Sequence, residues 1–451
     1  MNNTLGFLKW FGVRLLFLSI FLVILLGIIA YARGYRFDVK RKSLTSTGIV
    51  SVNSNPKSAK VYVNGELYDG VTDVDLTLPN GRYTIEIKKD GYTEWKREVA
   101  LKGEIVMSIN ALLFSKNPSL SPLTSLGLSK ALPVGQTENL LLFTENDNIE
   151  KDGIYFFEGT KKAISIFPPL NPIILKKNLP EGIEISSAEV TFSPEYDQGM
   201  FTFKLGDETV SYILSLSDDN LQPQDVTLAK ETIITAWEKE KNEQVIKILE
   251  TFPKDIRKVA TDSVQIVALA PDETKILYVA KKDVTLPRVI NPPIIGVNEG
   301  EEQRDIVTNN IYVYDKKEDR NFKVPVTFKI SSESSRLSAT QSAVLSPTPT
   351  VLPLEEDPEA TEEAQIDVLN EDVKEEVLSQ LQWFPDSKHL IMRENNQIAV
   401  IEYDGSNKVI VYSAGLQNNF FASTASYNLL VIVNLNPLNN KYGDLYTIGI
   451  R

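Results

Sequence analysis

One short unit recurs along the C-terminal part of the chain and constrains the fold more than any other feature. The unit is an apolar strand, a turn of Pro and an acidic residue, a second strand, and a third strand near an aromatic-Asp pair. Pro fixes one backbone dihedral and the acidic side chain caps the turn, so the first two strands form a tight hairpin. Clear copies begin at 188, 264 and 381, and weaker copies begin at 140 and 429. Repeated four-stranded units of about 40–45 residues are typical of a β-propeller, which we expect over residues 118–451 of a mainly β chain.

Three segments interrupt the repeat. Residues 237–260 carry one apolar stripe at helical spacing, with a kink expected at Pro253. We expect this helical insertion to pack on the propeller as a lid, and a helix that binds a partner is the alternative. Residues 283–309 are Pro-rich and lie between two strands of one unit, and residues 331–376 are of low complexity. About 237 residues remain without these segments, which suits five or six blades.

The low-complexity segment holds most of the chain's excess negative charge. Between Glu355 and Glu376, eleven of 22 residues are Asp or Glu, and the preceding residues are rich in Ser, Thr and Pro. Such a composition cannot bury enough apolar surface to order itself. We therefore predict a disordered Ser/Thr/Pro-rich and acidic insert over 331–376. Its role is either that of a solubilising insertion or that of a cation-binding or glycosylated loop.

An apolar run near the amino terminus predicts a membrane anchor over residues 15–32. The 17 residues Leu15–Tyr31 would span roughly 25 Å as a helix, at the short end for a bilayer. Trp10 and Tyr31 stand at its two ends, where interfacial aromatic residues are favoured. A cleaved signal peptide is the main alternative, because Ala30-Tyr31-Ala32 has the form of a cleavage site. A buried core helix is a further alternative, although the run shows no amphipathic pattern.

The charges beside this run do not agree on its orientation. Two basic residues precede it and five follow it within a basic juxtamembrane linker, residues 33–47. The positive-inside rule, counted simply, places the C-terminal flank in the cytoplasm, yet long domains often cross the membrane despite their charge. The family resemblance described below favours a cytoplasmic N-terminus, residues 1–14, and an extracytoplasmic body.

Residues 48–115 predict a small β-sandwich after the anchor. Short alternating strands are separated by turn residues, and Asn64-Gly65 between two of them is a strong hairpin signal. Five to seven strands within so short a segment are typical of a small sandwich module.

This segment resembles the PEGA domain family. The resemblance is carried by Ser54–Ala59, Val61–Gly65, Gly70–Thr72, Leu78–Gly81, Tyr83–Ile85 and Asp90–Tyr92. Two departures, Pro56-Lys57-Ser58-Ala59 and Thr72-Asp73, lie in turns. The resemblance implies a module of cell-surface and envelope proteins that holds or spaces other domains, either as a plain spacer or against the cell wall. Anchor, PEGA domain and propeller together look like a group of bacterial envelope proteins, on residues 32–38, 310–315 and 383–387.

The composition excludes several kinds of site. The chain has no Cys and one His, His389, which excludes disulfides, thiolate metal sites, cysteine nucleophiles and sites with two imidazoles. The net charge of −13 argues against a nucleic-acid binder. His389 follows a Pro-Asp turn and is predicted to be an ordinary strand residue. Asp218-Asp219 lacks the spaced oxygen ligands of an EF-hand and is predicted to be a solvated turn.

These observations predict a membrane-anchored extracytoplasmic protein that binds or scaffolds other molecules and is not an enzyme. We predict no catalytic, cofactor-binding or metal-binding residues. The expected partners are the lipid bilayer, through residues 15–32, and a cell-wall polymer or envelope protein. The alternatives are a hydrolase with carboxylate chemistry at the propeller channel, since 60 acidic residues give many chance pairs, and a cytoplasm-facing sensor.

Overall fold

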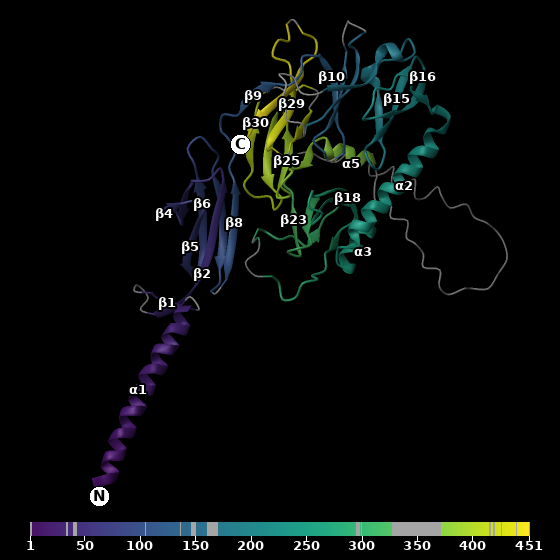
Figure 1. Cartoon of the computed structure of the whole chain (residues 1–451). Helices are drawn as coiled ribbons and strands as arrows, with labels where there is room; N and C mark the ends of the chain where they lie inside the picture. Colours follow the sequence, from purple (N-terminus) through teal and green to yellow (C-terminus); the bar gives the residue numbers. More distant parts are fainter. Residues whose placement is uncertain are drawn as a thin grey trace, which may run out of the picture. The chain divides into compact units, whose positions relative to one another are not determined.

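The computed structural model describes residues 2–32, 35–38, 43–103, 105–135, 137–145, 150–159, 170–294, 298, 300–326, 371–414, 416–417, 420–424, 426–438 and 440–450. These residues belong to two compact units (Figure 1). The first comprises Met1–Leu113 and Ile294–Glu299, and the second comprises Phe114–Pro293 and Gly300–Arg451.

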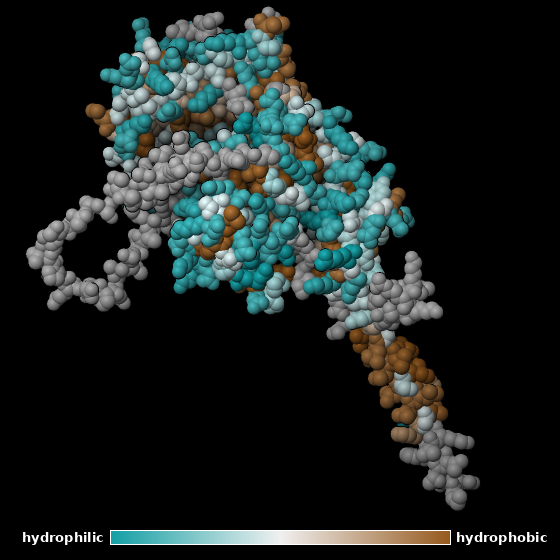
Figure 2. Space-filling model, turned by 180° about the vertical axis from the view of Figure 1, so that it is seen from behind, coloured by the Kyte–Doolittle hydropathy of each residue, from teal (hydrophilic) through white to brown (hydrophobic). Residues whose placement is uncertain are grey.

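The first unit begins with one long apolar helix, α1 (Asn2–Ala32). Its 23 residues Trp10–Ala32 are apolar enough and long enough to cross a membrane, and none of this span is buried against other parts of the protein. Figure 2 shows the span as a brown rod that contrasts with the mostly teal surface of the rest of the molecule. A core helix would be covered by other elements, so that alternative is wrong for α1.

Eight strands follow α1 and form two four-stranded sheets. In the first sheet β2 pairs with β1, with β5 and, in parallel, with β8, whereas the second sheet has the order β4-β3-β6-β7. The strands are β1 (Tyr35–Asp38), β2 (Ser43–Asn55), β3 (Lys60–Val63), β4 (Glu66–Val71), β5 (Val74–Pro79), β6 (Gly81–Lys88), β7 (Trp95–Leu101) and β8 (Val106–Leu112).

The two sheets form a sandwich, as the alternating pattern predicts. One apolar core contains Val50, Leu76 and Ile109 from the first sheet and Ile85 and Trp95 from the second. The predicted hairpin at Asn64-Gly65 is present, and both residues have positive φ, 52° and 83°. Such values suit a type I′ turn, which is why Asn and Gly are favoured there.

The second unit contains five four-stranded antiparallel sheets among its described residues, which we number as blades 1 to 5. Each of the first four is a meander in sequence order, apart from one hairpin inserted in blade 3. Blade 1 is β10 (Leu128–Pro133), β11 (Leu140–Thr144), β12 (Gly153–Phe157) and β13 (Leu170–Leu175). Blade 2 is β14 (Glu189–Phe192), β15 (Gln198–Leu205), β16 (Glu208–Ser215) and β17 (Gln224–Asp225). Blade 3 is β18 (Val264–Leu269), β19 (Lys275–Ala280), β22 (Ile311–Asp315) and β23 (Arg320–Lys323). Blade 4 is β24 (Leu381–Trp383), β25 (His389–Glu394), β26 (Gln397–Glu402) and β27 (Val409–Tyr412).

Blade 5 joins the two ends of the propeller. It contains β28 (Phe421–Ser423), β29 (Asn428–Val433) and β30 (Asp444–Gly449), and its outer strand is β9 (Ser119–Pro122) from the start of the unit. The Asp444 carboxylate strengthens this junction, because its Oδ1 accepts hydrogen bonds from the backbone N–H groups of Leu126 (2.7 Å) and Gly127 (3.1 Å) and from Thr124 Oγ1 (3.2 Å). Pairing between strands so far apart in sequence closes the order of blades.

Three pairs of neighbouring blades share apolar cores, which hold these sheets face to face. One core joins blades 1 and 2, a second joins blades 3 and 4, and a third joins blades 5 and 1. Between blades 4 and 5, Gln382 Nε2 donates to Phe421 O (3.3 Å) and the rings of Phe384 and Tyr427 lie 5.3 Å apart. Within the described residues, the repeated sheets and shared cores are those of a β-propeller with five blades, within the predicted number.

The predicted Pro-acid turns occur in blades 2, 3 and 4 with one shared backbone form. The residue after the acid has positive φ in each: Tyr196 57°, Glu273 55° and Ser387 58°. The predicted cap is confirmed at Asp272 and Asp386, whose Oδ1 atoms accept backbone N–H groups two residues on. It fails at Glu195, whose longer side chain instead accepts a hydrogen bond from Gln244 Nε2 (3.0 Å).

Helices connect blades 2 and 3 and precede blade 4. The predicted helical insertion is two helices, α2 (Lys230–Leu249) and α3 (Lys254–Asp262), separated at Pro253. Its apolar stripe packs on blade 3, since Leu249, Phe252 and Ile256 share a core with Tyr278 and Tyr314. Three short 3-10 helices, η1 (Lys176–Asn178), η2 (Ile185–Ser187) and η3 (Thr227–Ala229), flank blade 2.

Residues 331–370 of the predicted disordered insert lie outside the described residues. The prediction is wrong for the last six residues of the insert, 371–376, because they are helical. Glu371–Leu378 is a helix, α5, placed before the first strand of blade 4. Val373 and Val377 are four residues apart and both are buried in the core shared by blades 3 and 4. The many acidic residues around these two valines led to the prediction of disorder.

The Pro-rich segment between β19 and β22 covers the outer edge of blade 3. It contains a hairpin of β20 (Val284–Thr285) and β21 (Asp305–Ile306). Gln303 N–H donates to Asn321 O (2.8 Å), and Asn321 Nδ2 donates back to Gln303 O (2.6 Å). An uncovered edge strand invites pairing with other chains, so this loop protects β23.

Candidate functional site

His389 lies where the sequence predicts, as the first residue of β25. Its Nδ1 lies 2.6 Å from Asp386 Oδ2, and its ring is buried edge-on against Phe114 and Phe384. Burial alone would raise the pKa of Asp386, but the hydrogen bond and charge of His389 outweigh it and hold that pKa below its usual value. The pair is enclosed by aromatic rings, and no Ser oxygen is found bonded to His389 among the described residues.

Lys275 occupies the same position in blade 3 that His389 occupies in blade 4. Each is the first residue of its blade's second strand, and its carbonyl accepts the N–H of the residue before Pro. Lys275 Nζ is buried 3.5 Å from Asp315 Oδ2, and it also donates to Thr274 Oγ1 (3.0 Å) and lies 5.0 Å from the Tyr403 ring centroid. Its charge is therefore neutralised within the protein.

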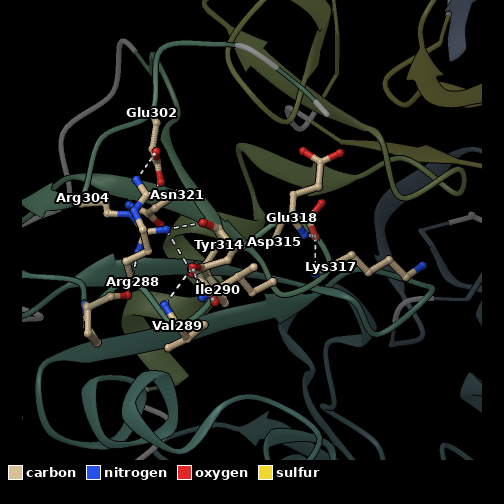
Figure 3. Close-up of polar contacts among 12 residues, drawn as sticks. Arg288, Val289, Ile290, Glu302, Arg304, Tyr314, Asp315, Lys317, Glu318 and Asn321 are labelled. Atoms are coloured by element: carbon tan, nitrogen blue, oxygen red, sulfur yellow. Dashed lines mark hydrogen bonds and ion pairs between the residues drawn. The ribbon is translucent and has the colours of Figure 1, made fainter. Parts of the chain in front are cut away.

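The densest polar cluster joins the Pro-rich loop to the turn after β22 (Figure 3). Arg304 is central: its guanidinium pairs with Asp319 Oδ1 (3.0 Å) and Glu302 Oε1 (2.6 Å) and donates to Pro287 O (2.6 Å). Arg288 pairs with the other oxygen of Glu302 (2.9 Å). We call Arg288, Glu302, Arg304 and Asp319 the loop clamp.

The buried carboxylate of Asp319 receives several donors besides Arg304. Its Oδ2 accepts the backbone N–H groups of Val289 and Ile290, both at 2.8 Å, and its Oδ1 accepts Tyr314 Oη–H (3.1 Å). Burial and the Asp319 charge raise the pKa of Tyr314 well above its usual value, which keeps this phenol protonated. The two guanidinium groups of the loop clamp neutralise its two carboxylates. The loop clamp therefore stabilises the fold of the loop and has no unpaired charge for a ligand.

The innermost strands carry one lysine beside helix α5. Lys130 on β10 donates to Ala188 O (2.8 Å) and lies 5.3 Å from the Phe143 ring. Burial lowers the pKa of Lys130, and the negative charges of Glu189 and Glu375 oppose that shift. Since Glu375 belongs to α5, this helix lies close to inner strands of blades 1, 3 and 4.

An apolar cavity of about 20 Å³ lies between α3 and blade 3 and is lined by Ile256, Tyr278 and Tyr314, among others. A water molecule needs about 10–15 Å³ of such space, so the cavity could hold one, but its lining is apolar. In the described residues no group of three or more His, Asp or Glu side chains could hold a metal ion.

Asp218 and Asp219 form an exposed turn, as predicted. Asp218 Oδ2 accepts Ser217 Oγ–H (3.0 Å) and its carbonyl accepts Asn220 Nδ2 (3.0 Å). The residues that carry the polar clusters, Lys275, Arg304 and Asp319, were not predicted. Only the repeated turn could have indicated Lys275, because it aligns with His389.

Comparisons with known proteins support the small unit most directly. The family model described as the PEGA domain matches residues 47–117. A search of curated proteins finds no match.

Three solved structures illustrate what the whole chain is similar to. They are a putative TolB from Agrobacterium tumefaciens (9% identity, 70% of this chain and 71% of that chain, TM-score 0.19), an uncharacterized protein from Listeria monocytogenes (13%, 74% and 67%, TM-score 0.20) and a protein of unknown function from Bacteroides thetaiotaomicron (10%, 86% and 78%, TM-score 0.20). TM-scores this low do not establish a common fold, and the propeller is identified by its own sheet order. Residues 47–117 of this chain, which form a sandwich with the predicted turns, match the PEGA domain family.

Proposed function

We propose that this chain is a membrane-anchored protein whose body lies outside the cytoplasm and that it binds or scaffolds other envelope components without catalysis. The observation that carries the proposal is the order of its parts: an uncovered apolar helix, a PEGA domain and a propeller. Exposure of this apolar helix to water would be unfavourable, because the free energy rises by about 25 cal/mol for each Å² of exposed apolar surface.

The paired charges of the propeller support the non-catalytic part of the proposal. Buried charges at Lys275, Arg304 and Asp319 are paired within the protein. Groups tuned for catalysis would instead present a free base or nucleophile to a cleft. A carboxylate hydrolase would need two acids facing one substrate, and the carboxylates of the loop clamp face arginines.

Two measurements test this proposal. Membranes would be washed with alkaline carbonate, which removes peripheral proteins, and the full chain is expected to stay in the pellet. A variant without residues 2–32 is expected in the soluble fraction. Release of the full chain by carbonate would contradict the anchor.

The binding role is tested by mild crosslinking in the native envelope, followed by pull-down of the full chain. We expect a small set of envelope proteins or wall fragments that is lost when residues 114–451 are removed. The same set recovered with α1 and the PEGA domain alone would assign binding to the small unit. Turnover of an envelope polymer by purified protein would contradict the non-catalytic proposal.

A further inference from the structure

Three buried side-chain polar atoms on blade 4 have no hydrogen-bond partner in the described part of the chain. One, Trp383 Nε1, belongs to a residue of the core shared with blade 3. The other two belong to Arg393, near the end of β25, and Tyr412, the last residue of β27. Arg393 Nε and Tyr412 Oη are both buried atoms without a hydrogen-bond partner. No carboxylate lies within ion-pair distance of the Arg393 guanidinium among the described residues, unlike Arg304. A buried polar group without a hydrogen bond destabilises the folded state, so such groups in native proteins call for a missing partner.

The register of the sheet brings these two side chains to one place. Arg393 pairs with Ile398 of β26, and Ile398 pairs with Tyr412 of β27. The three residues form one cross-strand row, so their side chains leave the same face of the sheet. Arg393 and Tyr412 are then two strand spacings apart, roughly 10 Å, a gap that two long side chains can close above Ile398.

This face of blade 4 is turned toward blade 5. The opposite face carries Met392 and Ala399, which belong to the core shared with blade 3. Gln382 lies on the same face as Arg393 by strand alternation, and it hydrogen-bonds Phe421 O of blade 5. The remaining side-chain surface of Arg393 and Tyr412 is partly exposed. Burial lowers the pKa of Arg393 and raises that of Tyr412, so the protein environment disfavours the charged form of each group.

We propose that Arg393 and Tyr412 form a binding site for a carboxylate group between blades 4 and 5. A guanidinium matches a carboxylate with two parallel hydrogen bonds, and the phenol hydroxyl supplies a third donor. One cation offsets one negative charge, whereas a phosphate dianion would leave a desolvated charge without a partner. The inference is independent of which side of the membrane the body occupies.

The test measures thermal unfolding of the full chain in detergent with sodium acetate or with sodium chloride at equal ionic strength. Acetate is expected to raise the melting temperature by about 2–5 °C more than chloride, because a ligand that binds only the folded state stabilises it. Arg393→Met should lose this response, and without acetate it should melt at the same temperature as the wild type or higher, because an unpaired desolvated charge is gone. Tyr412→Phe should fold normally and show about half of the response.

The matched control is Lys388→Gln, which removes one positive charge at the opposite, exposed end of the same hairpin. It should keep the full acetate response. Equal responses to acetate and chloride, or an acetate response retained in both Arg393→Met and Tyr412→Phe, would overturn the site. A stronger response to inorganic phosphate than to acetate, lost in Arg393→Met, would overturn the carboxylate assignment. If Arg393→Met does not fold, the Tyr412→Phe comparison decides alone.

Discussion

Removal of the Arg304 guanidinium should release the Pro-rich loop from blade 3. The side chain of Arg304 is 12% exposed and that of its partner Asp319 is 1% exposed. Breaking a buried ion pair by removing one partner costs about 3–5 kcal/mol, because the other charge stays buried. Asp319 keeps two backbone N–H donors and the Tyr314 hydroxyl, so we expect Arg304→Met to cost about 3 kcal/mol, at the low end of that range.

Arg288→Met is the matched control for this prediction. Arg288 pairs with the same Glu302 through one contact of 2.9 Å, but its side chain is 35% exposed. A pair this exposed contributes about 0–1 kcal/mol. Both substitutions remove a guanidinium from the loop clamp. They differ in how exposed the arginine is and in its partners, because Arg304 also loses Asp319 and Pro287 O whereas Arg288 loses only Glu302.

Hydrogen exchange measured peptide by peptide reports this local opening directly. A loss of about 3 kcal/mol corresponds to roughly 100-fold faster exchange, which we expect for amides in β21 and β23 of Arg304→Met. Exchange in β11 and β29 should stay unchanged. If Arg304→Met and Arg288→Met accelerate exchange equally, the reasoning from burial is refuted.

Three further predictions concern His389, Asp386 and Asp444. His389→Gln should leave any binding or turnover unchanged apart from a small loss of stability; a hundredfold loss of activity in a folded variant would make His389 functional. Asp386 has a lowered pKa in the folded chain, so its contribution is full above the unfolded pKa of about 3.9 and is lost as pH falls through the lower folded value. The stability difference between wild type and Asp386→Asn, measured by urea unfolding, should therefore shrink below about pH 4; a difference that grows there would contradict the pairing. Asp444→Ala leaves the N–H groups of Leu126 and Gly127 without their acceptor and should cost about 2–3 kcal/mol, seen as faster exchange in β9 and β30 but not in β19; unchanged exchange would show that Asp444 does not secure the junction.

Local signals predicted much of the fold. Pro271-Asp272 and Pro385-Asp386 define their hairpins by themselves, since a fixed dihedral and a side-chain cap act within four residues. Asn64-Gly65 works in the same way. The apolar runs of the second strands, such as Leu140–Phe143, are buried on both faces and were recognisable by composition alone.

The features that could not be predicted from the sequence depend on contacts between residues that are far apart in the chain. Nothing near Ser119–Pro122 shows that it pairs with β30, because register across more than 300 residues is fixed by the whole ring. Arg304 and Asp319 each look like ordinary surface charges until the loop folds against β23. The row of Arg393 and Tyr412 appears only once the strands are aligned. Helix α5 was missed because two buried valines are a weak signal among many acidic residues.

The orientation of the body is the central claim, and single cysteines test it most directly. The chain has no Cys, so Ser217→Cys on an exposed turn of blade 2 and Asn3→Cys before the apolar span each give one reporter. Intact spheroplasts would be treated with a maleimide that does not cross membranes, with permeabilised cells as the control. We predict that Ser217→Cys is labelled in intact spheroplasts and that Asn3→Cys is labelled only after permeabilisation. Labelling of Asn3→Cys with protection of Ser217→Cys would place the body in the cytoplasm and contradict the proposal.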